Sequence, residues 1–69
     1  MESIATVPSR KQALRIISEI VGQSSGWVVT GKTEVGPIYT KDDGTRTEKL
    51  YAREKSSRRW QIIKEDRSS

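Results

Sequence analysis

The sequence contains no cysteine, no histidine and no phenylalanine among its 69 residues. Without cysteine the chain can form no disulfide, and without histidine and cysteine it lacks the usual zinc ligands. The same two absences remove the commonest catalytic bases and nucleophiles. We therefore expect a protein that is not an enzyme and that holds no metal and no cofactor.

Long apolar runs are also missing. No segment approaches the ~20 apolar residues needed to span a bilayer, and the N-terminus lacks the regions of a signal peptide. We expect a soluble, intracellular protein, in the cytoplasm or with the nucleoid or nucleus, without a membrane partner. Apolar residues make up only 32% of the chain, so the core is small, and a chain this short usually needs a staple or a partner.

Positive charge is in excess. Lysine and arginine number 13 against 9 acidic residues, which leaves a net charge of +4, and the sequence pI is about 9.8. A basic balance favours anionic partners, namely nucleic acid, acidic lipid or an acidic protein.

The clearest periodic pattern lies in residues 9–22. On a helical wheel the apolar side chains of this segment fall within one arc of roughly 160°. The members of the arc are Ala13, Leu14, Ile16, Ile17, Ile20 and Val21. Ser9 can cap the first turn, Gln12 completes a capping box, and Gly22 suits the left-handed residue after the last turn. The pattern therefore predicts an amphipathic helix.

Arg10 and Lys11 stand in the first turn of this helix, where acidic residues are preferred. One interpretation is an anion site, because free backbone N–H groups and two cations would point at one place. The other is that exposed charges in a first turn cost little and have no role.

The rest of the chain reads as short strands separated by turns. Strands are expected at residues 27–30, 38–41, 45–54 and 59–64. The first of these strands extends to residue 33 if the turn that follows it lies at residues 34–37. Asp42-Asp43-Gly44 predicts a tight turn with positive φ at Gly44. Pro37 belongs at a strand start or an edge.

These elements predict an α+β fold. One N-terminal amphipathic helix packs on one face of a three- or four-stranded antiparallel β-meander, joined by short connections. Residues 7–64 form this single small domain, residues 1–6 are a flexible N-terminus, and residues 65–69 are a polar C-terminal tail.

Side chains alternate along a strand, so each strand can be assigned two faces. When the more apolar face of each strand is taken as the inward face, the predicted core consists of Leu14, Ile17, Ile20, Val21, Val29, Ile38, Leu50, Trp60 and Ile62. The opposite face then carries Tyr39, Lys41, Lys49, Tyr51, Arg53, Arg59 and Gln61. The register of the first strand stays open: if Val28 and not Val29 points inward, Trp27 moves outward.

The leading hypothesis is a small regulatory protein that binds nucleic acid, DNA or RNA, through this basic face. Phosphates would be held by Lys41, Arg46, Lys49, Arg53, Arg58 and Arg59, and Tyr39 and Tyr51 would stack on bases. The simpler interpretation is an ordinary solvated face, since Tyr, Thr and paired charges are common on exposed strands.

The alternative hypothesis is a protein-interaction module, either an inhibitor or an adaptor, that docks on an acidic protein partner. A sheet edge at the strand beginning with Pro37 would accept a partner strand. A homodimer through that edge, or through helix surface at Ile16, would also relieve the small core.

Residues 26–33, Gly-Trp-Val-Val-Thr-Gly-Lys-Thr, match the Walker A pattern at every fixed position. The pattern needs a strand before the phosphate loop and a helix after it. Here a helix precedes Gly26, strand formers fill the variable positions, and Pro37 follows closely. We therefore expect a turn at Gly31-Lys32 and no nucleotide-binding loop.

Overall fold

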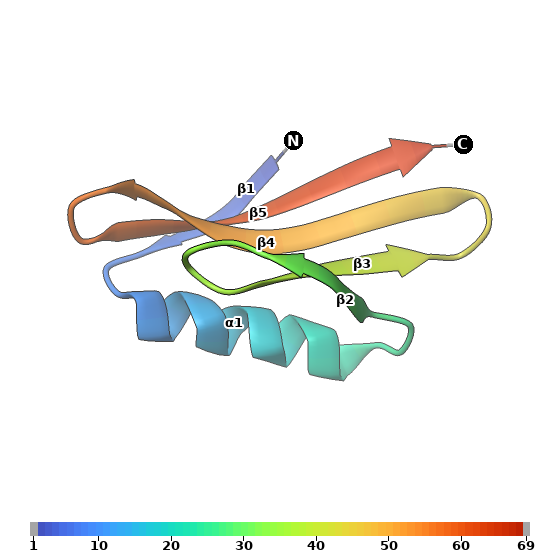
Figure 1. Ribbon diagram of the computed structural model, residues 1–69, viewed down its shortest axis with the longest axis horizontal. Coiled ribbons are helices and arrows are strands. Elements are labelled where there is room, and N and C mark those ends of the chain that lie inside the picture. Colours follow the sequence, from blue (N-terminus) through green and yellow to red (C-terminus); the bar gives the residue numbers. More distant parts are fainter. Residues whose placement is uncertain (1, 69) are drawn as a thin grey trace.

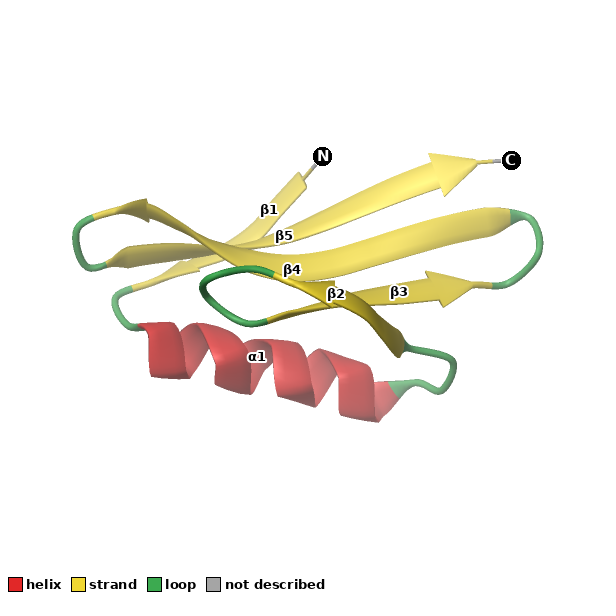
Figure 2. Ribbon diagram, in the orientation of Figure 1, coloured by secondary structure: helices red, strands yellow, loops and turns green. Residues whose placement is uncertain are grey.

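The computed structural model describes residues 2–68, which form one helix and one sheet (Figures 1 and 2). In chain order the elements are β1 (Glu2–Val7), α1 (Arg10–Gln23), β2 (Val28–Lys32), β3 (Pro37–Asp42), β4 (Arg46–Ser56) and β5 (Arg59–Ser68). The strands lie in the order β1-β5-β4-β3-β2, and every neighbouring pair is antiparallel. Helix α1 covers one face of this sheet (Figure 2). The predicted α+β fold, a helix on an antiparallel meander, is confirmed.

The sheet has five strands instead of three or four, because the N-terminal residues are not loose. From Glu2 onward they form β1, which pairs with β5, and Ala5 and Val7 pack against the core. The polar tail is likewise a strand, since β5 runs to Ser68 opposite Arg46. Residues 2–6 and 65–68, which the sequence placed outside the domain, are therefore strand residues of the same sheet. Met1 and Ser69 lie outside the described residues.

Helix α1 begins as the sequence predicts. Ser9 has an extended backbone, and its Oγ accepts a hydrogen bond from the Gln12 N–H at 3.2 Å. The end differs from the prediction, because Gly22 lies inside the last turn and the helix ends at Gln23. The capping residue Ser24 returns to the extended region of the backbone. Gly26 is the residue with a left-handed φ, 101°.

The core between the helix and the sheet is built from fully buried side chains of α1, β4 and β5 and from one loop residue. Its buried members are Ala13, Ile17, Val35, Leu50, Ala52 and Ile62. Ile20, Val21 and Trp60, which were predicted to be buried, lie partly exposed at its margin. Leu14, also predicted to be buried, is partly exposed. Val29 was also predicted to be buried, but it lies on the edge strand β2 and is 60% exposed.

Val35 reaches the core because the turn between β2 and β3 folds onto the helix. The Thr33 hydroxyl accepts hydrogen bonds from the backbone N–H groups of Val35 and Gly36 at 3.1 and 3.3 Å. The Thr33 N–H donates to the Gly36 carbonyl at 2.7 Å. The expected turn at Gly31-Lys32 is therefore wrong, since both residues belong to β2. The other alternative, a strand that runs on past Gly31 with the turn near residues 34–37, is the one the structure adopts. Within the Walker A match, residues 28–32 form strand β2 and not a loop.

The pairing of β3 with β4 reverses the predicted faces of β3. Asp42 lies opposite Thr47, and this closing pair places Tyr39 opposite Leu50 and Thr40 opposite Lys49. Residues directly opposite each other share a face, and a one-residue change of register exchanges all side chains between faces. Tyr39 and Lys41 therefore lie on the helix side, whereas Ile38 and Thr40 lie on the opposite side. Val29, opposite Tyr39, is on the helix side, which answers the open register of the first strand.

Candidate nucleic-acid interface

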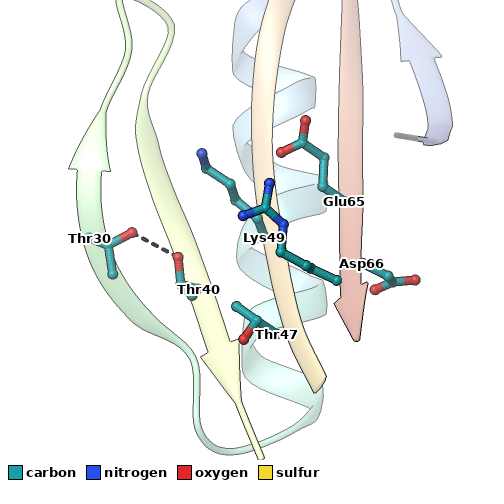
Figure 3. A pocket seen from close by; sticks show the side chains of 7 residues that line it. Thr30, Thr40, Thr47, Lys49, Glu65 and Asp66 are labelled. Carbon is teal, nitrogen blue, oxygen red and sulfur yellow. Dashed lines mark hydrogen bonds between the residues drawn. The ribbon is translucent and has the colours of Figure 1, made fainter. Parts of the chain in front are cut away.

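The face of the sheet opposite α1, called the outer face below, carries the side chains of alternate residues on each strand. Figure 3 looks onto part of it, with the helix behind the strands. On the central strands the outer face comprises Thr47, Lys49, Tyr51 and Arg53 of β4 and Arg59, Gln61, Ile63, Glu65 and Arg67 of β5. On the flanking strands it comprises Ser3 and Thr6 of β1, Ile38 and Thr40 of β3, and Val28 and Thr30 of β2.

Half of the predicted set shares this face. Lys49, Tyr51, Arg53 and Arg59 are brought together by the β4–β5 pairing, as the alternation predicted. Arg67 joins them opposite Thr47, and sequence reasoning missed it because residues 65–69 were read as a tail. Continuing the alternation of β5 past residue 64 would have placed Arg67 in the same row as Arg59.

The other predicted residues lie elsewhere. Tyr39 packs against the core, and the Lys41 Nζ lies 5.9 Å from the centre of the Trp27 ring on the helix side. Arg46 also lies on the helix side and pairs with Asp66 at 3.6 Å. Arg58 occupies the turn between β4 and β5 with a φ of 61°. The prediction that Tyr39, Lys41 and Arg46 belong to the same face as Lys49 is wrong, because the register of the strands places them behind the sheet.

Arg53 is held in place by a chain of side chains across three strands. Its Nε and Nη2 donate to the Gln61 Oε1 at 3.1 and 3.0 Å, and the Gln61 Nε2 donates to the Ser3 Oγ at 3.4 Å. Gln61 is only 8% exposed. A buried amide that accepts from a guanidinium on one side and donates on the other fixes the cation without neutralising it.

Tyr51 is also tied to its neighbours. Its hydroxyl donates to the Glu65 Oε1 at 3.4 Å. Burial, together with the negative charge of Glu65, raises the pKa of the Tyr51 hydroxyl. Ile63, directly opposite Tyr51, is 1% exposed although it lies on the outer face. This half of the outer face is therefore closely packed.

The salt bridges of the described residues lie on the helix and on the helix side of the sheet. Among residues 2–68 the salt bridges are Arg15–Glu19 at 3.9 Å, Arg46–Asp66 at 3.6 Å and Lys64–Glu48 at 3.0 Å. The first is on the helix and the other two are on the helix side of the sheet. The hydrogen bond and charge of Glu48 raise the pKa of Lys64, and burial opposes them. Within the described chain none of these pairs uses a cation of the outer face.

A hollow of about 440 Å³ lies on the outer face between the β2–β3 and β4–β5 hairpins. Its lining residues are Thr30, Thr40, Thr47, Lys49, Glu65, Asp66 and Arg67. Figure 3 shows Thr30 and Thr40 on one side of it, with their hydroxyls 2.8 Å apart, and Lys49 between them and Glu65. The lining combines three threonine hydroxyls, two cations and two carboxylates. Its hydroxyls and cations can bind phosphate or sugar oxygens, and Glu65 and Asp66 oppose an anion there.

The start of the helix offers less to an anion than the sequence suggested. The Arg10 Nε donates to the Val35 carbonyl at 2.9 Å, so this side chain fastens the β2–β3 turn to α1. Lys11 stays exposed. Of the two cations in the first turn, Arg10 is therefore engaged by the Val35 carbonyl, and Lys11 remains exposed to bind an anion.

The edges of the sheet differ from the predicted edge. β3, which begins at Pro37, lies between β2 and β4, so β1 and β2 are the edge strands. On β2 the side chains of Val28 and Val29 are 58% and 60% exposed. Ile16, the other predicted contact for a second copy, is partly buried against the core. A partner strand would therefore find β2, not β3.

Among residues 2–68 no three side chains of the metal-binding types come together. No helix in the described part of the chain is long and apolar enough to cross a membrane. In comparisons with known proteins, no family model matches the chain, and neither a curated protein nor a solved structure matches it.

Proposed function

We propose that this protein binds nucleic acid through the outer face. The observation that carries the proposal is the distribution of charge. In the outer-face rows of β4 and β5 the cations Lys49, Arg53, Arg59 and Arg67 stand with a single carboxylate, Glu65. The ion pairs of the described chain are made elsewhere.

Phosphate groups are the ligand that suits such a face. Each phosphate neutralised by a lysine or arginine releases counterions, which makes binding favourable at low salt and steeply dependent on salt. Arg53, already oriented by Gln61, keeps the rest of its planar guanidinium for a phosphate oxygen. The threonine hydroxyls of the hollow add neutral donors beside the cations.

The test compares two variants that remove the same charge from opposite sides of the molecule. Lys49→Gln/Arg59→Gln removes two outer-face cations, and Lys11→Gln/Arg15→Gln removes two exposed helix cations. We expect the first variant to bind a labelled nucleic-acid duplex about 10-fold more weakly than wild type, with a salt slope less steep by roughly 2. The helix variant should stay within about 3-fold of wild type, apart from a small long-range charge effect.

The measurement is fluorescence anisotropy between about 50 and 200 mM salt. An equal loss in both variants would show that net charge, and not the outer face, determines binding. An absence of wild-type binding at the lower salt would contradict the proposal and turn attention to the exposed edge of β2 as a docking site for a partner strand.

A further inference from the structure

The aromatic side chains are placed almost entirely on the wrong side of the sheet for stacking on bases. The chain has two tryptophans, two tyrosines and no phenylalanine. Trp27, Tyr39 and Trp60 pack partly buried against the core from the helix side. Only Tyr51 lies on the outer face.

Tyr51 is poorly suited to receive a base. Its side chain is half-buried between Lys49 and Arg53 in its own row, and it faces the buried Ile63 across the ladder. Its hydroxyl is bonded to Glu65. Proteins that bind single strands use several aromatic faces in succession along a groove, and the outer face has one ring that is already engaged.

The hollow on the outer face does not replace the missing rings. With a volume of about 440 Å³ it has room for a base, but its lining consists of threonine hydroxyls and charged side chains. An unstacked base gains little from such a lining, because it contains neither a flat apolar wall nor an aromatic ring. The threonine hydroxyls and the side chains of Lys49 and Arg67 suit phosphate and sugar oxygens, which a duplex presents along its whole surface, whereas Glu65 and Asp66 do not.

The spacing of the cations also favours a rigid ligand. Lys49 and Arg53 are four residues apart on β4, about 14 Å at ~3.4 Å per residue, and Arg59 and Arg67 are eight apart on β5, about 27 Å. Cations on strands of one sheet keep these separations. A duplex holds its phosphates at fixed positions, and the shorter of these two separations is close to the width of the B-DNA major groove, about 12 Å. A flexible single strand would have to be ordered first.

From these observations we infer that the outer face takes a nucleic-acid duplex, held through its phosphate backbone, and not a single strand. The inference rests on the proposed function and names its ligand class. Tyr51 then serves packing and not stacking, which replaces the role that the sequence suggested for the two tyrosines. DNA and RNA duplexes share the chemistry that the face recognises.

The experiment measures binding of three labelled probes to the wild-type protein at about 100 mM salt. The probes are a DNA duplex of about 20 base pairs, an RNA duplex of that length, and an oligo-dT of about 20 nucleotides. We expect at least one duplex to bind about 10-fold more tightly than oligo-dT. We also expect Tyr51→Leu to change the affinity for every probe by less than about 3-fold, whereas loss of one stacked base costs about 5- to 150-fold.

Each outcome is informative. Oligo-dT binding as tight as, or tighter than, both duplexes would overturn the inference and leave the proposed function standing. Binding to none of the probes would overturn the proposed function and the inference with it. If Tyr51→Leu does not fold by circular dichroism, the comparison of the three probes on the wild-type protein decides the question alone.

Discussion

At the scale of single residues, Asp43 holds the turn between β3 and β4 closed. Its Oδ1 accepts hydrogen bonds from the backbone N–H of Thr45 at 3.0 Å, the Thr45 hydroxyl at 3.0 Å and the backbone N–H of Arg46 at 2.9 Å. These hydrogen bonds lower the pKa of the Asp43 carboxyl. The largest contribution comes from the Thr45 backbone N–H, followed by the Thr45 hydroxyl and the Arg46 backbone N–H. The turn therefore prefers the charged form of this group.

This preference predicts how stability responds to acid. A carboxyl whose pKa is lower in the folded state than in the unfolded state contributes stability above the unfolded pKa, about 3.9 for aspartate. That contribution is lost as the pH falls through the lowered folded pKa. We expect wild type to lose more unfolding free energy between about pH 4 and pH 2 than Asp43→Asn, which keeps an amide oxygen as acceptor but does not titrate.

Urea unfolding of both proteins across this range provides the measurement. The other carboxyl groups titrate in wild type and variant alike, so the difference between the two curves isolates Asp43. Parallel curves would mean that the hydrogen bonds of this turn do not favour the charged form in solution.

At the scale of elements, the β2–β3 turn is docked on the helix by one hydrogen bond and one apolar side chain. Arg10 supplies the hydrogen bond to the Val35 carbonyl, and the Val35 side chain enters the core. A Cβ at Gly36 would come within 2.5 Å of the Leu14 Cδ2, so glycine here lets the turn lie against Leu14 without displacing its side chain. The turn is therefore part of the helix–sheet contact and not a loose connection.

Adjacent residues of the first helical turn test this contact. We expect Arg10→Ala to lower the unfolding free energy by about 1 kcal/mol, since it leaves the Val35 carbonyl without its charged donor. Lys11→Ala removes an equal charge from the next residue, and we expect it to be neutral or stabilising by a few tenths of a kcal/mol, because a cation opposes the helix dipole there.

Urea melts give both values, and the amide chemical shifts of Val35 and Gly36 report whether the turn has moved. Equal effects in the two variants would contradict a specific role for Arg10.

At the scale of the whole molecule, β1 brings the N-terminal part of the chain next to the C-terminal strand β5. It pairs with β5, so the N-terminal and C-terminal strands lie side by side and the helix follows directly under the sheet (Figure 1). Ala5 is opposite Ile62 on the helix side, and Thr6 is opposite Gln61 on the outer face. Without β1, one side of the buried strand β5 would lack its backbone partners.

Substitutions at two neighbouring residues of β1 test whether this strand is packed on the sheet or frayed. We expect Ala5→Asp to lower the unfolding free energy by about 2 kcal/mol, because it places a carboxylate against the core. Thr6→Asp introduces the same group on the exposed side, and we expect its effect to stay within about 0.5 kcal/mol. Denaturant titrations measure both, and two neutral variants would mean that β1 is not docked in solution.

The sequence by itself determined the local structure. The apolar arc from Ala13 to Val21 and the Ser9 cap specify the helix, and Asp42-Asp43-Gly44 specifies a turn with left-handed Gly44, whose φ is 94°. Alternation along residues 49–53 and 59–63 correctly separated the two faces of β4 and β5. These features depend on neighbours in the chain, so they can be read from its order.

Only the tertiary structure decided the features that depend on distant residues. The face of Tyr39 and Lys41 follows from the pairing of Asp42 with Thr47, and a shift of one residue in that pairing would exchange the faces. Val35 is buried in a cluster with side chains from the helix and from β4 and β5, and its carbonyl accepts a hydrogen bond from Arg10, 25 residues away. The strand character of the N-terminal residues depends on β5 at the other end of the chain, because a single polar strand is stable only when another strand supplies its hydrogen bonds.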